Sequence, residues 1–288
     1  MTTIYHYCDV NAFLSIMQGK KLRLCSTSKM NDANEGSLVE RAILGVMEKS
    51  IKTNDFKLLK ATISMAKDET YACCFSSDED SVVQWMNYAD QGKGFAIGFD
   101  ADKLVTENDC ARLQSAADYF GLASDNLPNN MVNLGPVVYY DAGAERAINA
   151  SLSRALNNIE KNEEGNSNWW PLFVQCTWFD TITKDASFTH EGEYRMCHIP
   201  MPRGLIGMFR GEYHRNSVLG ELHWRVSRYG LAPYYEFEVP PESITEIYVG
   251  PRNPDHHGAS GTSLVEMFCR LQGVHGAKVK MSKSPYRG

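Results

Sequence analysis

Phe188-Thr-His-Glu-Gly-Glu-Tyr-Arg-Met-Cys197 contains two carboxylates, Glu191 and Glu193, separated by a single glycine. The partly apolar run that follows, from Tyr194 to Ile199, predicts a strand. Residues i and i+2 of a strand point to the same face, so both carboxylates would enter one space if the strand begins by Glu191. Two like charges that close repel unless a cation or a polar ligand shares the space. The stretch therefore predicts a site or, in the simpler interpretation, an exposed strand end with two solvated glutamates.

The size and composition of the chain are those of a globular protein. Its 288 residues allow one large domain or two small ones, and 43% of them are hydrophobic and 22% charged. No apolar run reaches the ~18 residues of a membrane span. The first residues, Met1 to His6, lack the basic and apolar segments of a signal peptide. Because no repeat or linker interrupts the chain, we expect a single domain over residues 1–288. Because the sequence shows neither a membrane span nor a signal peptide, we expect the protein in the cytoplasm and without a membrane partner.

The cysteines and the net charge indicate the redox state of the thiols and the class of partner. The eight cysteines are scattered, none forms a C-x-x-C pair, and most lie in apolar runs, which predicts reduced, buried thiols. The net charge is -6, and the basic residues are dispersed until the last dozen positions, where Lys278, Lys280, Lys283 and Arg287 cluster. Nucleic-acid binders usually show a basic face, so a nucleic-acid partner is not favoured. The cluster could form a local contact with an anion or a phosphate.

Hydrophobic periodicity and turn residues predict the elements. Strands are expected at 3–7, 21–24, 71–75, 95–99, 136–140, 194–199, 222–226, 233–239, 244–249 and 278–281. Helices are expected at about 9–19, 38–47, 56–65, 82–88, 144–160, 169–179 and 261–271. Strands and helices do not alternate strictly, which favours an α+β fold with mainly antiparallel central sheets and flanking helices over a doubly wound fold.

Several common catalytic and binding motifs are missing. The chain has no G-x-G-x-x-G that opens a helix, no P-loop and no G-x-S-x-G. His190 and His198 are metal-ligating residue types close to Glu191 and Glu193, but on a strand they would face away from the two glutamates. We therefore expect no metal site.

Six ordered blocks carry a resemblance to a known family. They are Tyr5-His6-Tyr7 with Gly19-Lys-Lys-Leu-Arg23; Met30-Asn-Asp32 with Glu35-Gly36; Cys74-Phe-Ser-Ser77 with Gln84-Trp85, Tyr88-Ala89 and Gly94-Phe-Ala-Ile-Gly-Phe99; Lys184, Phe188 and Glu191-Gly-Glu-Tyr-Arg195; Ile247-Tyr-Val-Gly-Pro251; and Ser282-Lys-Ser-Pro-Tyr-Arg287. Together, over nearly the whole chain, they resemble a widespread bacterial family, domain of unknown function 2971. Tyr194 stands where that family usually has tryptophan.

A more distant resemblance, to mono-ADP-ribosyltransferases and their toxin relatives, rests on the order of three short motifs. His6 lies in the first strand, Phe75-Ser76 ends a middle strand, and Glu191-x-Glu193 comes later. In that superfamily these positions anchor NAD, lie beside the nicotinamide and supply the catalytic glutamate. The resemblance implies an ADP-ribosyltransferase-like enzyme that transfers ADP-ribose from NAD to a protein or small-molecule acceptor, or an NAD glycohydrolase. Such an enzyme could be an intracellular toxin or a phage-defence effector.

The same resemblance implies roles for single residues. Glu193 would be the catalytic carboxylate that stabilises the positive charge on the ribose, and Glu191 would orient or deprotonate the acceptor. The residues expected to bind NAD are His6, Tyr7, Arg23, Ser76, Trp85, Tyr88 and Arg195. Among these, His6 would bind the adenosine ribose, Trp85 or Tyr88 would stack on nicotinamide, and Arg23 or Arg195 would meet the pyrophosphate. Arg195 could instead pair with Glu193 within the strand.

Two further hypotheses stay open from the sequence. The chain could be a non-enzymatic nucleotide-sensing or protein-interaction domain that has the same fold. It could also be a hydrolase or an RNA-end-processing enzyme that uses the same polar groove. The Glu-x-Glu pair favours the transferase, whereas the acidic net charge counts against an enzyme that acts on RNA.

Overall fold

The computed structural model describes residues 2–30, 44–45, 47–48, 57, 60, 70–106, 108, 110–115, 118, 132–157, 170–200, 217–227, 230–257 and 261–286. The strands are β1 Thr3–Cys8, β2 Lys21–Ser26, β3 Tyr71–Ser76, β4 Phe95–Asp100, β5 Ala111–Arg112, β6 Val132–Pro136, β7 Val138–Tyr140, β8 Thr183–Asp185, β9 Glu193–His198, β10 His223–Ser227, β11 Gly230–Glu238, β12 Ile244–Val249 and β13 Lys278–Met281. The helices are α1 Val10–Gly19, α4 Val82–Tyr88, α5 Ala101–Thr106, α7 Ala142–Asn157, α8 Trp170–Ile182 and α10 Ser263–Leu271, with short 3-10 helices η1 Thr27–Lys29, η4 Ala186–Glu191, η6 Pro241–Ser243 and η7 Pro254–His257.

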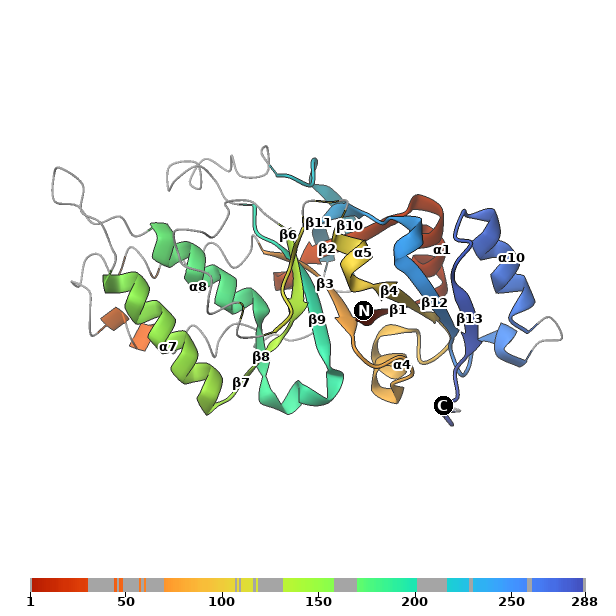
Figure 1. Cartoon of the computed structure of the whole chain (residues 1–288), viewed down its shortest axis with the longest axis horizontal. Coiled ribbons are helices and arrows are strands. Elements are labelled where there is room, and N and C mark those ends of the chain that lie inside the picture. The colour runs from red at the N-terminus through yellow and green to blue at the C-terminus, as the bar shows by residue number, and fades with distance from the viewer. Residues whose placement is uncertain are drawn as a thin grey trace.

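Eleven of these strands form one sheet, in the order β10-β11-β2-β3-β1-β4-β12-β13, with β9, β6 and β5 joined to it through β3 (Figure 1). The sheet forks at β3. One edge of β3 pairs with β9 along its whole length, but the other edge meets β2 at Tyr71 and Ala72 and meets β1 only at Ser76. Strands β1 and β2 therefore diverge along β3. This fork positions the cavity described below.

The sheet is mixed, which corrects the expectation of a mainly antiparallel one. Most neighbours run antiparallel, but β13 runs parallel to β12, β5 runs parallel to β6, and the separate small sheet of β7 and β8 is parallel. Parallel neighbours need a long crossover connection. The chain provides one between β12 and β13 that contains α10, and a stretch that includes α7 and α8 separates β7 from β8.

Helices cover both faces of the sheet. On one face, α1 and α10 pack on β4, where Phe13 stacks on Phe95 at 4.0 Å between ring centroids and lies 5.8 Å from Phe268. On the other face, α4 buries Trp85 against Tyr7, at 4.8 Å, within a second apolar cluster. Asp80 fixes the start of α4, because it accepts hydrogen bonds from Trp85 Nε1 at 2.7 Å and from the backbone N–H of Lys283 at 2.7 Å. Helix α4 is therefore held between the sheet and the segment that follows β13.

Most elements expected from the sequence are confirmed. The helix expected at about 9–19 is α1, and Asp9 caps it by accepting from the backbone N–H of Ala12 at 2.7 Å. The single strand expected at 136–140 is wrong in one respect, because these residues belong to two strands. Strand β6 pairs with β9 and ends at Pro136, which has no N–H to donate to a strand ladder, and β7 beyond it pairs with β8. Helix α5 was not predicted. The helices expected at 38–47 and 56–65 lie largely outside the described residues.

The structure also bears on the expectations about cysteines, membrane spans and domain number. All eight cysteines are thiols, and five of them are buried. No helix in the described ranges combines the length and the apolar character needed to cross a membrane. The single domain over residues 1–288 stays a prediction.

Candidate functional site

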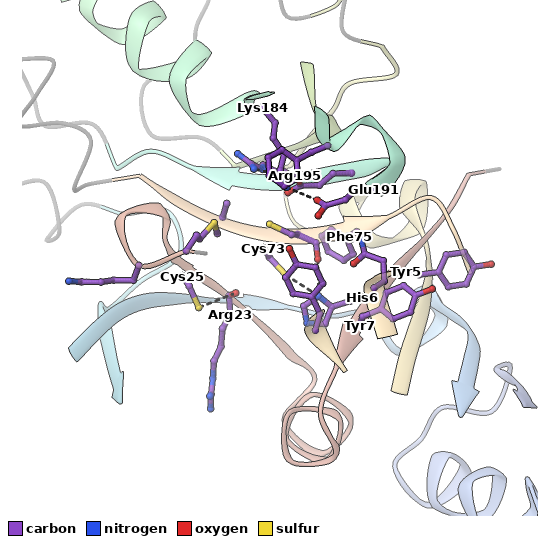
Figure 2. A pocket seen from close by; sticks show the side chains of 18 of the residues that line it. Tyr5, His6, Tyr7, Arg23, Cys25, Cys73, Phe75, Lys184, Glu191 and Arg195 are labelled. Carbon is purple, nitrogen blue, oxygen red and sulfur yellow. Dashed lines mark hydrogen bonds and ion pairs between the residues drawn. The ribbon is translucent and has the colours of Figure 1, made fainter. Parts of the chain in front are cut away.

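A cavity of about 410 Å³ opens at the fork of the sheet. Its volume lies within the ~300–1,000 Å³ range of small-molecule sites. Figure 2 shows Lys184, Glu191 and Arg195 on one side and His6 and Tyr7 on the other. The cavity therefore brings residues from the beginning of the chain to the paired carboxylates that the sequence singled out.

The two carboxylates meet because the chain turns sharply between them. Glu191 is the last residue of η4 and Glu193 is the first of β9, so the expected strand at Glu191 is wrong. Gly192 joins them in the left-handed conformation, with φ +51°, and its carbonyl accepts from the backbone N–H of Ser77 at 2.9 Å. The side chains still converge, but a left-handed turn produces this convergence and strand alternation does not.

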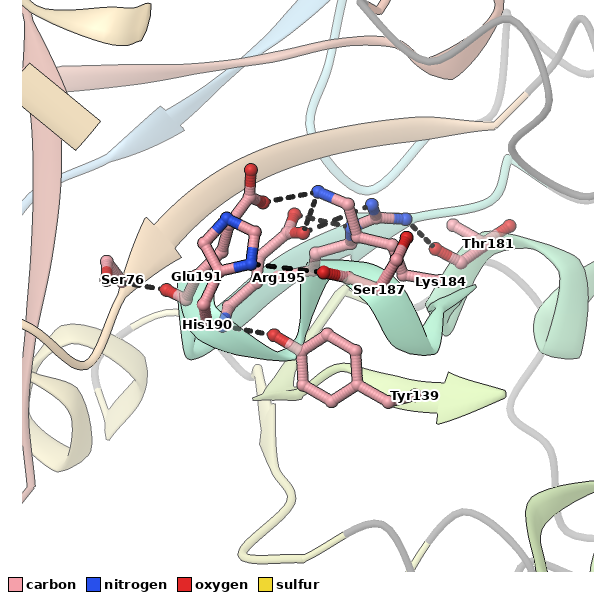
Figure 3. Close-up of polar contacts among 9 residues, drawn as sticks. Ser76, Tyr139, Thr181, Lys184, Ser187, His190, Glu191 and Arg195 are labelled. Atoms are coloured by element: carbon pink, nitrogen blue, oxygen red, sulfur yellow. Dashed lines mark hydrogen bonds and ion pairs between the residues drawn. The ribbon is translucent and has the colours of Figure 1, made fainter. Parts of the chain in front are cut away.

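Both glutamates are buried, which excludes the interpretation of a solvated strand end: Glu191 is 4% and Glu193 is 5% exposed. Lys184, on β8, lies between them and donates to Glu191 Oε2 at 2.5 Å and to Glu193 Oε2 at 2.8 Å (Figure 3). Arg195 donates from Nε to Glu193 Oε1 at 2.8 Å and from a second nitrogen to the carbonyl of Thr181 at 2.7 Å. Lys184 and Arg195 are thus the cations that the closeness of two carboxylates requires.

The electrostatics of this cluster fix its protonation. Burial opposes the charge of Glu193, but the neighbouring Arg195 and Lys184 outweigh burial and lower the pKa of Glu193 to about 2. Burial likewise acts against the charge of Lys184, whose pKa is nevertheless raised because Glu193 and Glu191 surround the ammonium group. Glu193 and Lys184 are therefore both charged at neutral pH.

Glu193 and Glu191 differ in how many of their oxygens are engaged. Lys184 and Arg195 occupy both carboxylate oxygens of Glu193. Glu191 accepts one side-chain bond, from Lys184 to Oε2, and its Oε1 has no hydrogen bond from any residue in the described ranges. Glu191 is consequently the carboxylate that is available to a ligand in the cavity.

Replacing Gly192 by alanine is expected to lower the free energy of unfolding by about 1–2 kcal/mol, because a side chain strains a left-handed backbone. An added Cβ would also lie 2.3 Å from Ser77 Oγ, so this hydroxyl would have to turn aside. Thermal unfolding measures the change. The control is Gly19→Ala at the end of α1, where nothing lies within 4 Å and the free energy of unfolding should stay the same or rise slightly. Equal melting temperatures for the two variants would contradict the strain at Gly192.

His6 occupies the fork between β1 and β3. Its Nδ1 lies 2.9 Å from the carbonyl oxygen of Cys74, and because a carbonyl only accepts, Nδ1 carries the proton. Burial lowers the pKa of His6, so the ring is neutral and Nε2 is an acceptor. Tyr5 and Tyr7, the neighbours of His6 on β1, pack with Trp85 in the second apolar cluster. His6 can therefore accept a hydrogen bond from a hydroxyl group in the cavity.

Tyr88 faces the carboxylates from α4. Burial, followed by the negative charge of Glu191, raises its pKa to about 12. Tyr88 lines the cavity, whereas Trp85 and Ser76 lie behind the cavity wall. The hydroxyl of Ser76 donates to the carbonyl of Glu191 at 2.8 Å, so Ser76 positions the turn that carries the carboxylates. Trp85 is completely buried and supports Tyr7.

Tyr7 and Arg195 reach the cavity but are bound within the protein. The hydroxyl of Tyr7 donates to the carbonyl of Asp78 at 2.8 Å and accepts from the backbone N–H of Ser81 at 3.0 Å. Arg195 is 2% exposed and holds Glu193, which matches the alternative of a salt bridge within the strand. Arg23 remains the member of this predicted pair that is open to an anionic ligand.

Sequence reasoning from the residues did not find three cations of the site. Lys184 was noted only as part of the family resemblance, and Lys29 and Arg225 were not singled out. The repulsion between Glu191 and Glu193 predicts that a cationic side chain lies near them, but it does not identify the residue that provides it. Arg225 gives no local signal, because it reaches the cavity through the pairing of β10 with β11 and of β11 with β2.

The metal-ligating residue types near the site do not gather. His190 bonds the carbonyl of Ser187 within its own turn, and His198 lies at the far end of β9, where Nε2 is 2.8 Å from Ser217 Oγ. Within the described ranges, no group of three or more His, Cys, Asp or Glu is placed to hold a metal ion.

Comparisons with known proteins give a partial match to one family model and no activity. Residues 84–196 match the model of the family described as "Protein of unknown function (DUF2971)". This match covers less than half of the chain and includes Tyr88, Lys184 and the Glu191 to Arg195 stretch. It supports the resemblance to domain of unknown function 2971. No curated protein and no solved structure matches the chain.

Proposed function

We propose that the protein is an ADP-ribosyltransferase-like enzyme whose substrate is NAD, bound in the cavity at the fork of the sheet. The observation that carries this proposal is the buried Glu191–Lys184–Glu193 cluster at the cavity wall, with His6 on the opposite side. Two carboxylates held at a cavity wall suit a reaction that develops positive charge on a bound sugar.

The reaction begins with cleavage of the bond between the nicotinamide nitrogen and C1′ of the ribose. The bonding electron pair goes to nicotinamide, which leaves as a neutral molecule, and positive charge develops on the ribose ring. A hydroxyl or amine of the acceptor, or water, then attacks C1′ and loses its proton to a base. A carboxylate beside the ribose stabilises the positive charge and accepts a bond from a ribose hydroxyl.

The contacts within the cluster change the roles expected from the resemblance. Because two cations occupy Glu193, we assign Glu191 to the ribose and Glu193 to holding Lys184 and Arg195 in place. Tyr88 closes the same part of the cavity and would pack on nicotinamide. The neutral His6, with its acceptor Nε2, suits a hydroxyl of the adenosine ribose.

Release of nicotinamide from NAD tests the proposal directly. Purified protein is incubated with NAD, with and without cell lysate, and free nicotinamide is measured by chromatography. Release that needs lysate is the expected result for a transferase with a macromolecular acceptor. Release by the protein alone would indicate glycohydrolase activity or self-modification.

Binding is measured separately from turnover in the same preparation. NAD at a hundredfold excess over its Kd should add about 2.7 kcal/mol to the free energy of unfolding and so raise the melting temperature. The proposal fails if NAD neither raises the melting temperature nor yields nicotinamide under any of these conditions.

One observation favours a second candidate, a non-enzymatic domain that binds a nucleotide. The positive charges of Lys184 and Arg195 balance the negative charges of Glu191 and Glu193, so the cluster is neutral as a whole. A neutral cluster can serve as a rigid wall for a ligand without any chemistry. For this candidate, NAD or ADP-ribose would raise the melting temperature while NAD stays intact.

A further inference from the structure

We propose that the end of the cavity beside β10 is a phosphate-binding subsite, in which Arg225, Arg23 and Lys29 hold the diphosphate of a nucleotide. All three residues lie outside the stretch that matches the family model. The identity of the ligand as a dinucleotide rests on the proposed function. The subsite itself rests on the position of these three side chains in the cavity and on Nε of Arg225, which is unpaired among the described residues.

The alternation of β10 turns Arg225 toward the cavity. Trp224 and Val226 are exposed, at 56% and 88%, whereas Arg225 between them is half-buried and lines the cavity. Strand β10 pairs with β11, and β11 pairs with β2, which carries Arg23. The arrangement of these three strands therefore directs Arg225 and Arg23 into one cavity.

The cavity has a surplus of positive charge. Its lining includes five cationic side chains, namely Arg23, Lys29, Lys184, Arg195 and Arg225, and two carboxylates, Glu191 and Glu193. Both carboxylates are engaged by Lys184 and Arg195, so three positive charges have no carboxylate among the described lining residues. The chain as a whole carries a charge of -6, so this surplus is local. A local surplus of this kind attracts an anion.

The hydrogen-bond donors at this end have capacity for a ligand. Nε of Arg225 is buried and has no hydrogen-bond partner in the described part of the chain. The Arg23 guanidinium lies over the ring of Tyr234, 4.9 Å from its centroid, which leaves its in-plane N–H groups for an acceptor. Glu236, opposite Arg23 in the sheet, accepts from Lys21 at 2.7 Å. A buried N–H without an acceptor is unfavourable, so an anion at Arg225 would relieve it.

A diphosphate fits these donors better than a carboxylate or a neutral ligand does. Guanidinium groups bind phosphate oxygens in pairs of parallel hydrogen bonds, and a lysine adds a point charge. A diphosphate presents several oxygens and two negative charges to two arginines and one lysine. With its diphosphate here, a dinucleotide would extend from β10 toward the carboxylates at η4 and β9.

Isothermal titration calorimetry on the full chain tests the subsite with ADP-ribose and with adenosine, which lacks phosphate. We expect Arg225→Gln to weaken ADP-ribose binding by about 10- to 100-fold, the usual worth of hydrogen bonds to a charged group, and to leave adenosine binding unchanged. The matched control is Arg270→Gln, an exposed arginine on α10 that does not line the cavity, for which ADP-ribose binding should not change. Melting temperatures without ligand show that each variant is folded.

The outcomes separate this inference from the proposed function. Unchanged ADP-ribose binding by folded Arg225→Gln overturns the subsite, even if NAD is cleaved. Binding of ADP-ribose that depends on Arg225, with NAD left intact, supports the subsite and counts against the enzyme. A wild-type protein that binds a single-stranded oligonucleotide through Arg225 and ignores ADP-ribose overturns the diphosphate assignment.

Discussion

Replacing Glu193 by glutamine is expected to lower the free energy of unfolding by about 3–5 kcal/mol, because the variant leaves buried positive charge without its carboxylate. Arg195 is 2% and Lys184 is 7% exposed, and both donate to Glu193, so neither can move into water without disturbing β8 or β9. For a chain of this size the melting temperature should fall by roughly 5–8 °C. Thermal or denaturant unfolding measures the effect.

The pH dependence of stability gives an independent check. The pKa of Glu193 is lowered to about 2 in the folded protein from about 4.3 in the unfolded chain. Its contribution, about 3 kcal/mol, is therefore fully present above the unfolded value and is lost as the pH falls toward 2. The difference in stability between wild type and Glu193→Gln should shrink over this range.

The control for Glu193→Gln is Glu242→Gln. Glu242 is an exposed glutamate in η6, so this substitution should change the free energy of unfolding by no more than about 0.5 kcal/mol. A Glu193→Gln protein that unfolds like wild type at neutral pH would mean that the ion pairs do not stabilise the fold. The same result would remove the assigned role of Glu193 in fixing Lys184.

Glu191→Gln is expected to reduce NAD turnover by about 10²–10³-fold, the usual loss when one group that stabilises a developing charge is removed. The glutamine oxygen can still accept from Lys184, and Lys184 keeps Glu193, so the free energy of unfolding should fall by only ~1 kcal/mol. The contrast between a large kinetic effect and a small stability effect distinguishes Glu191 from Glu193. Initial rates of nicotinamide release, well below the melting temperature, measure it.

Glu266→Gln on α10 is the control for turnover, because Glu266 accepts from Thr262 at 3.1 Å and does not line the cavity. Turnover by Glu191→Gln within twofold of wild type would remove Glu191 from the mechanism. Suppose that Glu193→Gln, measured at a temperature at which it is folded, lost turnover while Glu191→Gln kept it. Glu193 would then be the catalytic carboxylate, as the resemblance implies.

The sequence predicted local structure well and long-range pairing less well. Caps, turns and apolar runs are encoded in neighbouring residues, which is why α1 with its Asp9 cap and the strands at β4 and β12 were predicted close to their positions. The parallel pairs depend on crossovers whose path has no local signature, so the sheet was expected to be mainly antiparallel.

The candidate site shows the same division. The Glu191 and Glu193 pair is recognisable because both residues lie in one short stretch, but a left-handed turn at Gly192, and not strand alternation, brings their side chains together. The burial of the pair could not be predicted, because it depends on Lys184 from β8 and on the packing of β9 against β3 and β6. Arg225 reaches the cavity through three strands, and no spacing in the sequence reports such a relation.

The order of the strands also determines when the sheet can be completed. Strand β4 lies between β1, near the start of the chain, and β12, which follows only after most of the chain has been made. Contacts between such distant segments form slowly, because long loops must close first. During synthesis, one edge of the fully buried β4 would therefore remain open until β12 arrives. An open, apolar edge is a template for association with other chains, so this protein is most vulnerable to aggregation before its last strands are in place.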